Sequence, residues 1–182
     1  MKVIYLIGLP GSGKSTVMKQ FMETMEWGAE RPIDLLDTHI NESKTVRVLG
    51  KYENGETFSG TDRLSMAVSP KAIEWIKTNP NEVIFGEGDR LNNAKFFEAC
   101  GDGLTIIHLT VSDEERERRY QQRGSDQSEK FIQTVKTKCE NVIQRFGSRQ
   151  TIFGEEEGCV VEMKNENPED TQKIVDFMHN LL

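Results

Sequence analysis

Residues 8–16 of this chain read Gly8-Leu9-Pro10-Gly11-Ser12-Gly13-Lys14-Ser15-Thr16. The stretch fits the phosphate-binding pattern GxxxxGK[ST] through Gly8, Gly13, Lys14 and Ser15. In such a loop the glycines let backbone N–H groups turn toward phosphate oxygens, the lysine reaches the β- and γ-phosphates, and the hydroxyl binds Mg²⁺. We therefore expect residues 8–16 to hold the phosphates of a nucleoside triphosphate.

The residues on either side of this loop fit a strand before it and a helix after it. Val3 to Ile7 form a short apolar run of the kind that is buried in a parallel sheet. After the loop, apolar side chains recur at helical spacing at Val17, Met18, Phe21, Met22 and Met25. Gly28 is the expected end of this helix. A glycine-rich turn that arose by chance would not be expected to have a strand directly before it and a helix directly after it. The N-terminus of that helix would face the loop, and this arrangement favours anion binding.

Length and composition predict one α/β domain over residues 1–182. No stretch approaches the roughly 20 apolar residues of a membrane span, so we expect no membrane partner. Cys100, Cys139 and Cys159 are widely spaced and contain no CxxC pair, which is typical of reduced thiols in the cytoplasm. The oligomeric state cannot be read from the sequence.

The net charge of −7 gives the chain no overall basic field that would attract nucleic acid. Residues 111–150 differ, because they hold nine Lys or Arg against seven Asp or Glu. The positive charge is therefore local, which suits a phosphate clamp better than a long polyanion track.

Short strands and helices alternate along the chain. Further strands are expected at Val83–Phe85, Leu104–Leu109 and Cys159–Val161, and helices at Ser69–Lys77, Ser112 onward, Ser128–Phe146 and Pro168 onward. The segment 29–62 is the least regular, with a possible strand at Thr45–Tyr52. This alternation predicts three layers, namely a parallel sheet with helices on both faces.

The phosphate-binding loop does not fit two large classes of nucleotide-binding protein. GTPases need an Asn-Lys-x-Asp motif that recognises guanine, and no Asn-Lys dipeptide occurs in the sequence. Motor-type ATPases usually show an apolar strand that ends directly in Asp, whereas this strand continues Phe85-Gly86-Glu87-Gly88-Asp89-Arg90. The small size, the early loop and a late arginine-rich helix resemble the nucleoside and nucleotide kinase group of P-loop kinases. This resemblance implies the P-loop NTPase fold, with ATP and Mg²⁺ as cofactors and Lys14 as a catalytic residue.

The arginine-rich segment resembles the lid of those kinases, which would cover about residues 112–130. Arg119 and Arg123 lie at i and i+4, so both emerge on one helix face. Phosphoryl transfer needs cations around the moving group and exclusion of water, and both are expected of an arginine-bearing lid. A solvated helix is the alternative, and it fits Arg116 and Arg118 as well as the lid does.

A second polar cluster follows the strand Val83–Phe85. Ligands bind at the carboxyl ends of the strands in open parallel sheets, so Glu87 and Asp89 should face the loop. Glu87 is expected to hold Mg²⁺ or to orient the attacking hydroxyl, and Asp89 and Arg90 to contact the acceptor. For Asp89 the alternative is a cap on a helix that starts at Leu91.

A third cluster, Phe58–Ser65, precedes the helix at Ser69. P-loop kinases typically take the acceptor in this region. Asp62 is a candidate general base and acceptor contact, and Arg63 a candidate cation for the acceptor. A simple turn ion pair between Asp62 and Arg63 is the alternative.

Several segments together resemble small phage-encoded P-loop kinases, among them the 5-hydroxymethyluracil DNA kinases. They are Leu49–Tyr52, Gly60–Met66, Gly86–Leu91 and Arg123–Ser128. The resemblance implies that the acceptor is the hydroxymethyl group of a modified DNA base, and that the protein works in the host cytoplasm. The acidic net charge departs from what DNA binding leads one to expect.

The sequence thus predicts an ATP- and Mg²⁺-dependent kinase that phosphorylates a hydroxyl, most directly on 5-hydroxymethyluracil in phage DNA. A free nucleoside, nucleotide or other small molecule is the alternative acceptor. An ATP-binding regulatory module without transfer activity is the alternative from another class, although a sensor needs no second charged clamp.

Overall fold

The computed structural model describes residues 1–53, 59–78, 80–124, 128–147 and 159–182. For Arg123 it describes the backbone but not the side chain. Within these residues, seven strands form one sheet in the order β2-β3-β4-β5-β1-β6-β7. The strands are β1 (Lys2–Ile7), β2 (Trp27–Ile33), β3 (Leu36–Asn41), β4 (Val46–Leu49), β5 (Val83–Glu87), β6 (Leu104–Thr110) and β7 (Val160–Lys164). The helices are α1 (Lys14–Met22), α2 (Val68–Lys77), α3 (Ala94–Cys100), α4 (Asp113–Arg123), α5 (Glu129–Phe146) and α6 (Pro168–Asn180), with short 3-10 helices at Thr61–Arg63 and Gly101–Gly103.

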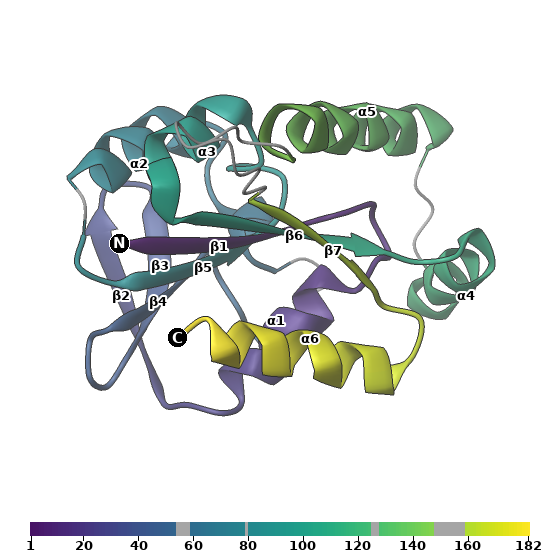
Figure 1. Cartoon of the computed structure of the whole chain (residues 1–182), viewed down its shortest axis with the longest axis horizontal. Coiled ribbons are helices and arrows are strands. Elements are labelled where there is room, and N and C mark those ends of the chain that lie inside the picture. The colour runs from purple at the N-terminus through teal and green to yellow at the C-terminus, as the bar shows by residue number, and fades with distance from the viewer. Residues whose placement is uncertain (54–58, 79, 125–127, 148–158) are drawn as a thin grey trace, which may run out of the picture.

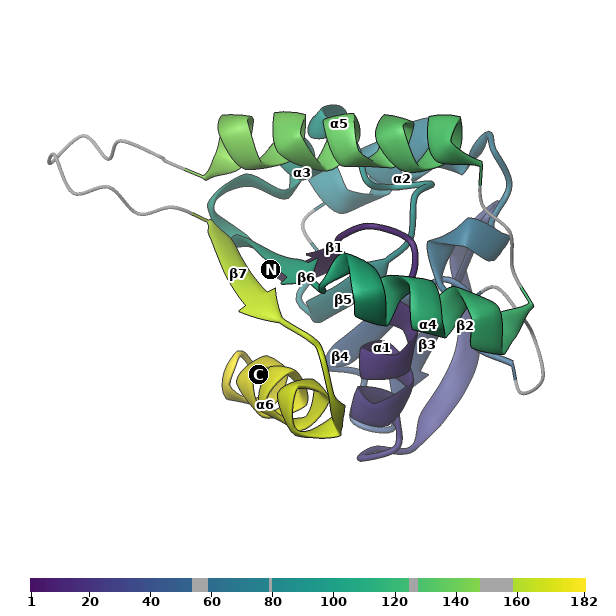
Figure 2. The same cartoon turned by 90° about the vertical axis from the view of Figure 1, so that its right-hand side faces the viewer.

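Helices cover both faces of the sheet, as predicted. α2, α3 and α5 lie on one face, and α1 and α6 lie on the other (Figures 1 and 2). β1 sits between β5 and β6, and its side chains alternate between the two cores. Val3 and Tyr5 pack into the first core, whereas Ile4 and Leu6 pack into the second. The chain therefore has the three-layer α/β architecture of a P-loop NTPase.

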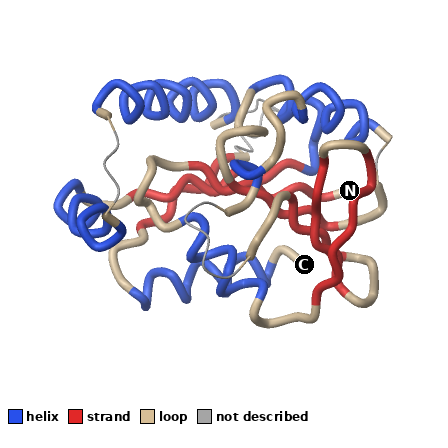
Figure 3. The backbone as a smooth tube through the Cα atoms, turned by 180° about the vertical axis from the view of Figure 1, so that it is seen from behind, coloured by secondary structure: helices blue, strands red, loops and turns tan. Residues whose placement is uncertain are grey.

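The sheet is not wholly parallel, which corrects one expectation from the sequence. β4, β5, β1, β6 and β7 run parallel, but β3 is antiparallel to both β2 and β4. β2 and β3 lie in the segment that was expected to be least regular. β2 is mostly exposed and carries few apolar residues, so it lacks the alternation that identifies a strand. Figure 3 shows these strands at one end of the sheet.

The helix after the phosphate-binding loop is shorter than predicted. It ends at Met22, and Gly28 lies inside β2 rather than at a helix end. The indole Nε1–H of Trp27 donates to the carbonyl oxygen of Met22 at 2.7 Å. Because this bond satisfies one of the last helical carbonyls, the chain leaves the helix here without a glycine.

Three predicted helix starts are confirmed by their caps. The side chains of Ser112, Ser128 and Asn167 accept hydrogen bonds from the third residue beyond each of them. The apolar spacing in residues 128–146 predicts a buried stripe on α5 at Phe131, Val135, Cys139, Val142 and Phe146. The last four are buried, but Phe131 corrects this prediction, because 42% of its surface is exposed.

The three cysteines are free thiols, with Cys100 and Cys139 buried and Cys159 partly buried. None of the helices that the structure describes is long and apolar enough to cross a membrane.

Candidate functional site

The phosphate-binding loop lies where β1 and β5 end side by side. Leu6 of β1 pairs with Glu87, the last residue of β5, so the loop that starts at Gly8 faces Glu87 across the sheet edge. Lys14 Nζ donates to the carbonyl oxygens of Gly8 at 2.9 Å and Leu9 at 3.1 Å. Burial lowers the pKa of Lys14, and the nearby Glu87 carboxylate opposes that shift. The lysine is thus folded over its own loop, next to a carboxylate.

Glu87 is a buried carboxylate with two hydroxyl partners. Its side chain is 1% exposed, and Oε1 accepts from Ser15 Oγ at 3.1 Å and from Tyr52 OH at 3.3 Å. Burial raises the pKa of Glu87 to about 7, although Lys14 acts in the other direction. Gly60 packs against this side chain so closely that a Cβ there would collide with Glu87 Oε1.

The Ser15 and Glu87 oxygens fit the ligands of a hard divalent cation. Two neighbouring ligands of an octahedral Mg²⁺, each about 2.1 Å from the ion, are roughly 3 Å apart, which matches the observed separation of 3.1 Å. Mg²⁺ is usually bound by one or two carboxylates together with substrate phosphates. A hydroxyl and one carboxylate beside a phosphate-binding loop are a donor set of this kind.

A cavity between the loop, the end of β5 and α5 brings together most of the predicted residues. We call it the β5-side cavity. Its described lining includes Gly8, Pro10, Gly11, Gly13, Lys14, Ser15, Ser59, Asp62, Glu87, Gly88, Asp89, Asn92, Tyr120, Phe131 and Val135.

Asp62 and Asp89 both line this cavity, and each carboxylate holds a neighbouring element. Asp62 Oδ1 accepts from the backbone N–H of Asp89 at 2.5 Å. The carboxylate of Asp89 pairs with Lys138 of α5 at 2.7 Å. The alternative in which Asp89 caps a helix at Leu91 is wrong, because α3 begins at Ala94 and is capped by Asn93.

Arg63 and Arg90 are absent from the described lining of the β5-side cavity. Arg63 pairs with Glu53 at 2.7 Å, and Arg90 Nε donates to the carbonyl oxygen of Leu64 at 3.4 Å. The alternative of a turn ion pair between Asp62 and Arg63 does not match these contacts either.

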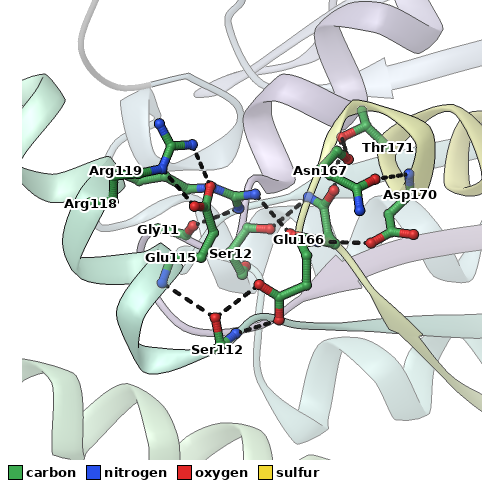
Figure 4. A network of polar contacts seen from close by, with 11 residues as sticks. Gly11, Ser12, Ser112, Glu115, Arg118, Arg119, Glu166, Asn167, Asp170 and Thr171 are labelled. Carbon is green, nitrogen blue, oxygen red and sulfur yellow. Dashed lines mark hydrogen bonds and ion pairs between the residues drawn. The ribbon is translucent and has the colours of Figure 1, made fainter.

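A second cavity lies on the other side of the loop, between α4, the loop that follows β7 and the start of α6. We call it the β7-side cavity; its described lining includes Gly13, Thr16, Gln20, Glu115, Arg118, Arg119, Gln122, Asn165, Glu166, Asn167, Pro168 and Thr171. Figure 4 shows the polar network along it.

Arg119 joins α4 to the phosphate-binding loop. Its guanidinium donates to the carbonyl oxygens of Gly11 at 3.1 Å and Asn165 at 2.8 Å, and to Glu115 at 2.8 Å (Figure 4). Hydrogen bonds from Arg118 and Arg119 lower the pKa of Glu115 to about 2. The side chain of Arg123, the other predicted lid arginine, lies outside the described residues.

Arg118 fits the alternative of a solvated helix, since 57% of its side chain is exposed, whereas the side chain of Arg116 is only 17% exposed. Each pairs with an acidic residue three positions earlier on α4, Arg116 with Asp113 at 2.8 Å and Arg118 with Glu115 at 2.6 Å. Such intrahelical pairs are typical of an exposed helix face.

The sequence analysis missed three residues that contact the loop or its cavities. Asn165 is buried, donates from Nδ2 to Ser12 O at 2.8 Å and accepts from Thr171 Oγ1 at 2.8 Å. Gly13 has φ +89°, and a Cβ there would collide with this amide. Tyr120 OH donates to Pro10 O at 2.7 Å, and Asn92 lines the β5-side cavity. The one available signal was that Asn165 lies two residues before the Asn167-Pro168 cap, where β7 ends.

Comparisons with known proteins concern the fold and the family of the chain. No curated protein matches the chain. The fold resembles the unliganded crystal structure of a sugar kinase from Janibacter sp. HTCC2649, with a TM-score of 0.50 and 11% identity over 100% of this chain and 94% of that one. A likeness at this identity concerns the fold alone. The family model described as P-loop Nucleotide Kinase3 matches residues 1–180. The chain therefore belongs to this family of P-loop nucleotide kinases.

Proposed function

We propose that this phosphotransferase moves the γ-phosphoryl group of ATP to an alcohol, with Mg²⁺ as cofactor. The observation that carries the proposal is the lining of the β5-side cavity, where Asp62, Glu87 and Asp89 face the loop that holds Lys14. An acceptor phosphate would need cations at this place, whereas an acceptor hydroxyl needs a carboxylate within hydrogen-bond reach. The acidic lining therefore favours an alcohol over a phosphate as the acceptor.

Each residue has a role in this proposal. Residues 8–16 hold the phosphates through backbone N–H groups, and Lys14 neutralises charge on the β- and γ-phosphates. Ser15 and Glu87 would hold Mg²⁺, which would supply positive charge to neutralise the charge that develops during transfer. Asp62 accepts the proton of the attacking hydroxyl, and Asp89 contacts the acceptor.

The lid is part of the same proposal. α4 leaves the carboxyl end of β6 beside the phosphate-binding loop (Figure 1), and Arg119 already contacts Gly11 of that loop. We assign Arg119 and Arg123 to the stabilisation of phosphate charge, and residues 112–130 to the exclusion of water. Arg63 and Arg90 would contact the acceptor only after leaving their present partners.

For the acceptor, we propose the hydroxymethyl group of 5-hydroxymethyluracil in phage DNA. The sequence resemblance to phage base kinases supports it. The base also offers a neutral primary alcohol, which is the kind of acceptor that the acidic lining of the cavity favours. A free nucleoside or nucleotide is the second candidate, which the family description supports.

The test is transfer of labelled γ-phosphate from ATP with Mg²⁺ to three acceptors. These are DNA that contains 5-hydroxymethyluracil, a mixture of free nucleosides and nucleotides, and a ring-free polyol such as ribitol; unmodified thymine DNA is the control. Label on the modified DNA alone supports the proposal, and label on free nucleosides moves the assignment to a metabolite kinase. ATP binding without transfer to any acceptor would instead favour a regulatory module.

A further inference from the structure

The carboxylate of Glu87 is held on one of its two oxygens. Oε1 accepts from Ser15 Oγ at 3.1 Å and from Tyr52 OH at 3.3 Å. Gly60 packs against the same oxygen, because a Cβ at this position would collide with Oε1. Two hydroxyl groups and one backbone segment therefore fix the direction in which this buried carboxylate points.

The backbone joins Tyr52 to Gly60. Lys51 N donates to Gly60 O at 3.1 Å, and Gly60 N donates to Lys51 O at 2.8 Å. Thr61, the next residue, donates from Oγ1 to the backbone carbonyl oxygen of Glu87 at 2.9 Å. The two segments that this bridge connects thus meet the end of β5 as one unit, which gives the Tyr52 hydroxyl a defined position.

Tyr52 contacts Glu87 from outside the β5-side cavity. It is absent from the described lining of that cavity, and it lines a separate cavity together with His39 and Lys51. The rings of His39 and Tyr52 meet edge to face, with their centroids 6.0 Å apart. Tyr52 therefore acts on a ligand in the β5-side cavity through Glu87 and not by direct contact.

Divalent cations differ in what they require of a carboxylate. Mg²⁺ demands a near-ideal octahedron with ligands at about 2.0–2.1 Å, whereas Ca²⁺ accepts six to eight oxygens at about 2.3–2.6 Å and often takes both oxygens of one carboxylate. To offer both oxygens to an ion beside Ser15, Glu87 would have to turn, which would draw Oε1 away from Tyr52. The hydrogen bond from Tyr52 therefore favours the ion that needs a single carboxylate oxygen.

We infer that Tyr52 is a positioning residue that makes the site formed by Ser15 and Glu87 select Mg²⁺ over Ca²⁺. Its hydroxyl holds Oε1 toward Ser15 and keeps Glu87 a one-oxygen ligand. Groups that hold a metal ligand in this way typically contribute roughly 10- to 100-fold to metal affinity. This inference rests on the proposed function, because it concerns the ion selectivity of the Mg²⁺ site assigned there.

The experiment measures nucleotide binding and needs no acceptor. Calorimetry gives the Kd of a non-hydrolysable ATP analogue with excess Mg²⁺, with excess Ca²⁺ and with EDTA. The Kd in EDTA divided by the Kd with an ion is the factor by which that ion tightens binding. For the wild-type protein we expect Mg²⁺ to tighten binding by roughly 10- to 100-fold, and Ca²⁺ to tighten it less.

The variant Tyr52→Phe removes the hydroxyl and keeps the ring. The Kd in EDTA should stay the same, because Tyr52 does not belong to the described lining of the β5-side cavity. The Mg²⁺ factor should fall by roughly 10-fold and the Ca²⁺ factor by less, so the preference for Mg²⁺ shrinks. His39→Phe is the control, since it changes the ring beside Tyr52 and should keep the wild-type factors for both ions.

The variant Glu87→Gln shows whether Tyr52 acts through the carboxylate. It should lower the Mg²⁺ factor by itself, and adding Tyr52→Phe to it should have no further effect. A merely structural role of Tyr52 would instead weaken binding equally with Mg²⁺, with Ca²⁺ and with EDTA.

The outcomes separate this inference from the proposed function. If Glu87→Gln lowers the Mg²⁺ factor but Tyr52→Phe leaves the preference for Mg²⁺ over Ca²⁺ unchanged, the inference is overturned and the proposed metal site stands. If Mg²⁺ does not tighten binding to the wild-type protein, both fail. A loss in Tyr52→Phe that is selective for Mg²⁺ supports the inference, even where no acceptor receives label and the proposed transfer fails.

Discussion

Two buried asparagines on opposite sides of the phosphate-binding loop are built into very different surroundings. Asn165, on the β7-side cavity, is 1% exposed and its amide bonds both Ser12 O and Thr171 Oγ1. Asn92, on the β5-side cavity, is 4% exposed, and its amide oxygen has no partner among the described residues. The amide of Asn165 is therefore satisfied within the chain, whereas the amide oxygen of Asn92 is not. Burial of a polar group alone therefore does not reveal its role, and its partners have to be examined.

The largest expected effect concerns the loop that both sides share. Lys14→Ala should lower phosphate transfer by on the order of 10³-fold, because a fixed positive charge beside the transferred group is lost. Single-turnover transfer from labelled ATP measures it. Lys19→Ala removes a cation from the same helix, outside the described linings of both cavities, and should keep near-wild-type rates. Transfer by Lys14→Ala at more than a tenth of the wild-type rate would contradict the proposed role.

The difference between the two asparagines can be tested by making the same substitution at both sites. Asn165→Leu should lower the free energy of unfolding by about 4 kcal/mol, since two buried polar groups lose their partner. Asn92→Leu should leave it within about 1 kcal/mol or raise it, because no hydrogen bond is lost. Urea denaturation of the protein without ligands measures both. Similar losses for the two variants would show that Asn92 is structural.

The β5-side cavity should also differ from the β7-side cavity in how pH changes the stability of the protein, because Glu87 lines the β5-side cavity. Folding raises the pKa of Glu87 from 4.5 to about 7, so the folded protein retains a proton that the unfolded chain releases between these values. The stabilisation from this proton is complete below about pH 4.5 and is lost as the pH rises to about 7. Without ligands, Glu87→Gln should remove on the order of 3 kcal/mol of this decline. Urea denaturation at pH 5 and pH 8 tests it, and parallel pH profiles for wild type and variant would refute it.

The smallest effect is expected at the ion pair between Asp89, which lines the β5-side cavity, and Lys138 of α5. Lys138 and Asp89 remain 30% and 40% exposed, so their attraction is screened by solvent. Lys138→Met should change the free energy of unfolding by less than about 1 kcal/mol. Thermal unfolding checks this, with Lys136→Met on the same helix as the control. A loss above about 2 kcal/mol would mean that this contact, rather than a ligand, holds the cavity together.

The sequence predicted the parts of the fold that carry a local signal. The strands around β1, β5, β6 and β7 are apolar runs, and Ser112, Ser128 and Asn167 are cap residues of known preference. β2 was missed because an exposed edge strand shows no apolar alternation. β3 lies between β2 and β4 and was missed because it is largely polar, with Leu36 and Ile40 as its apolar residues. The end of α1 was missed because the cap on it is the indole group of Trp27, a residue type with no known preference for helix ends.

For the site, the sequence located Lys14, Ser15, Asp62, Glu87 and Asp89, which the structure brings to one cavity. It assigned no role to Asn92 or Asn165, because loops far apart in the chain bring them beside the phosphate-binding loop. Phe131 was expected on the buried stripe of α5, because helical spacing cannot tell a core position from a cavity wall.

The strand β2 also bears on how this sheet avoids joining another. β2 is an outer strand of the sheet, where unpaired backbone groups could recruit a strand from a second molecule. It carries Glu30, Arg31 and Pro32, and its pairing with β3 shifts register between Glu30 and Ile33. Charge, a missing N–H and a bulge are the features that block strand addition. This edge is thereby protected against aggregation.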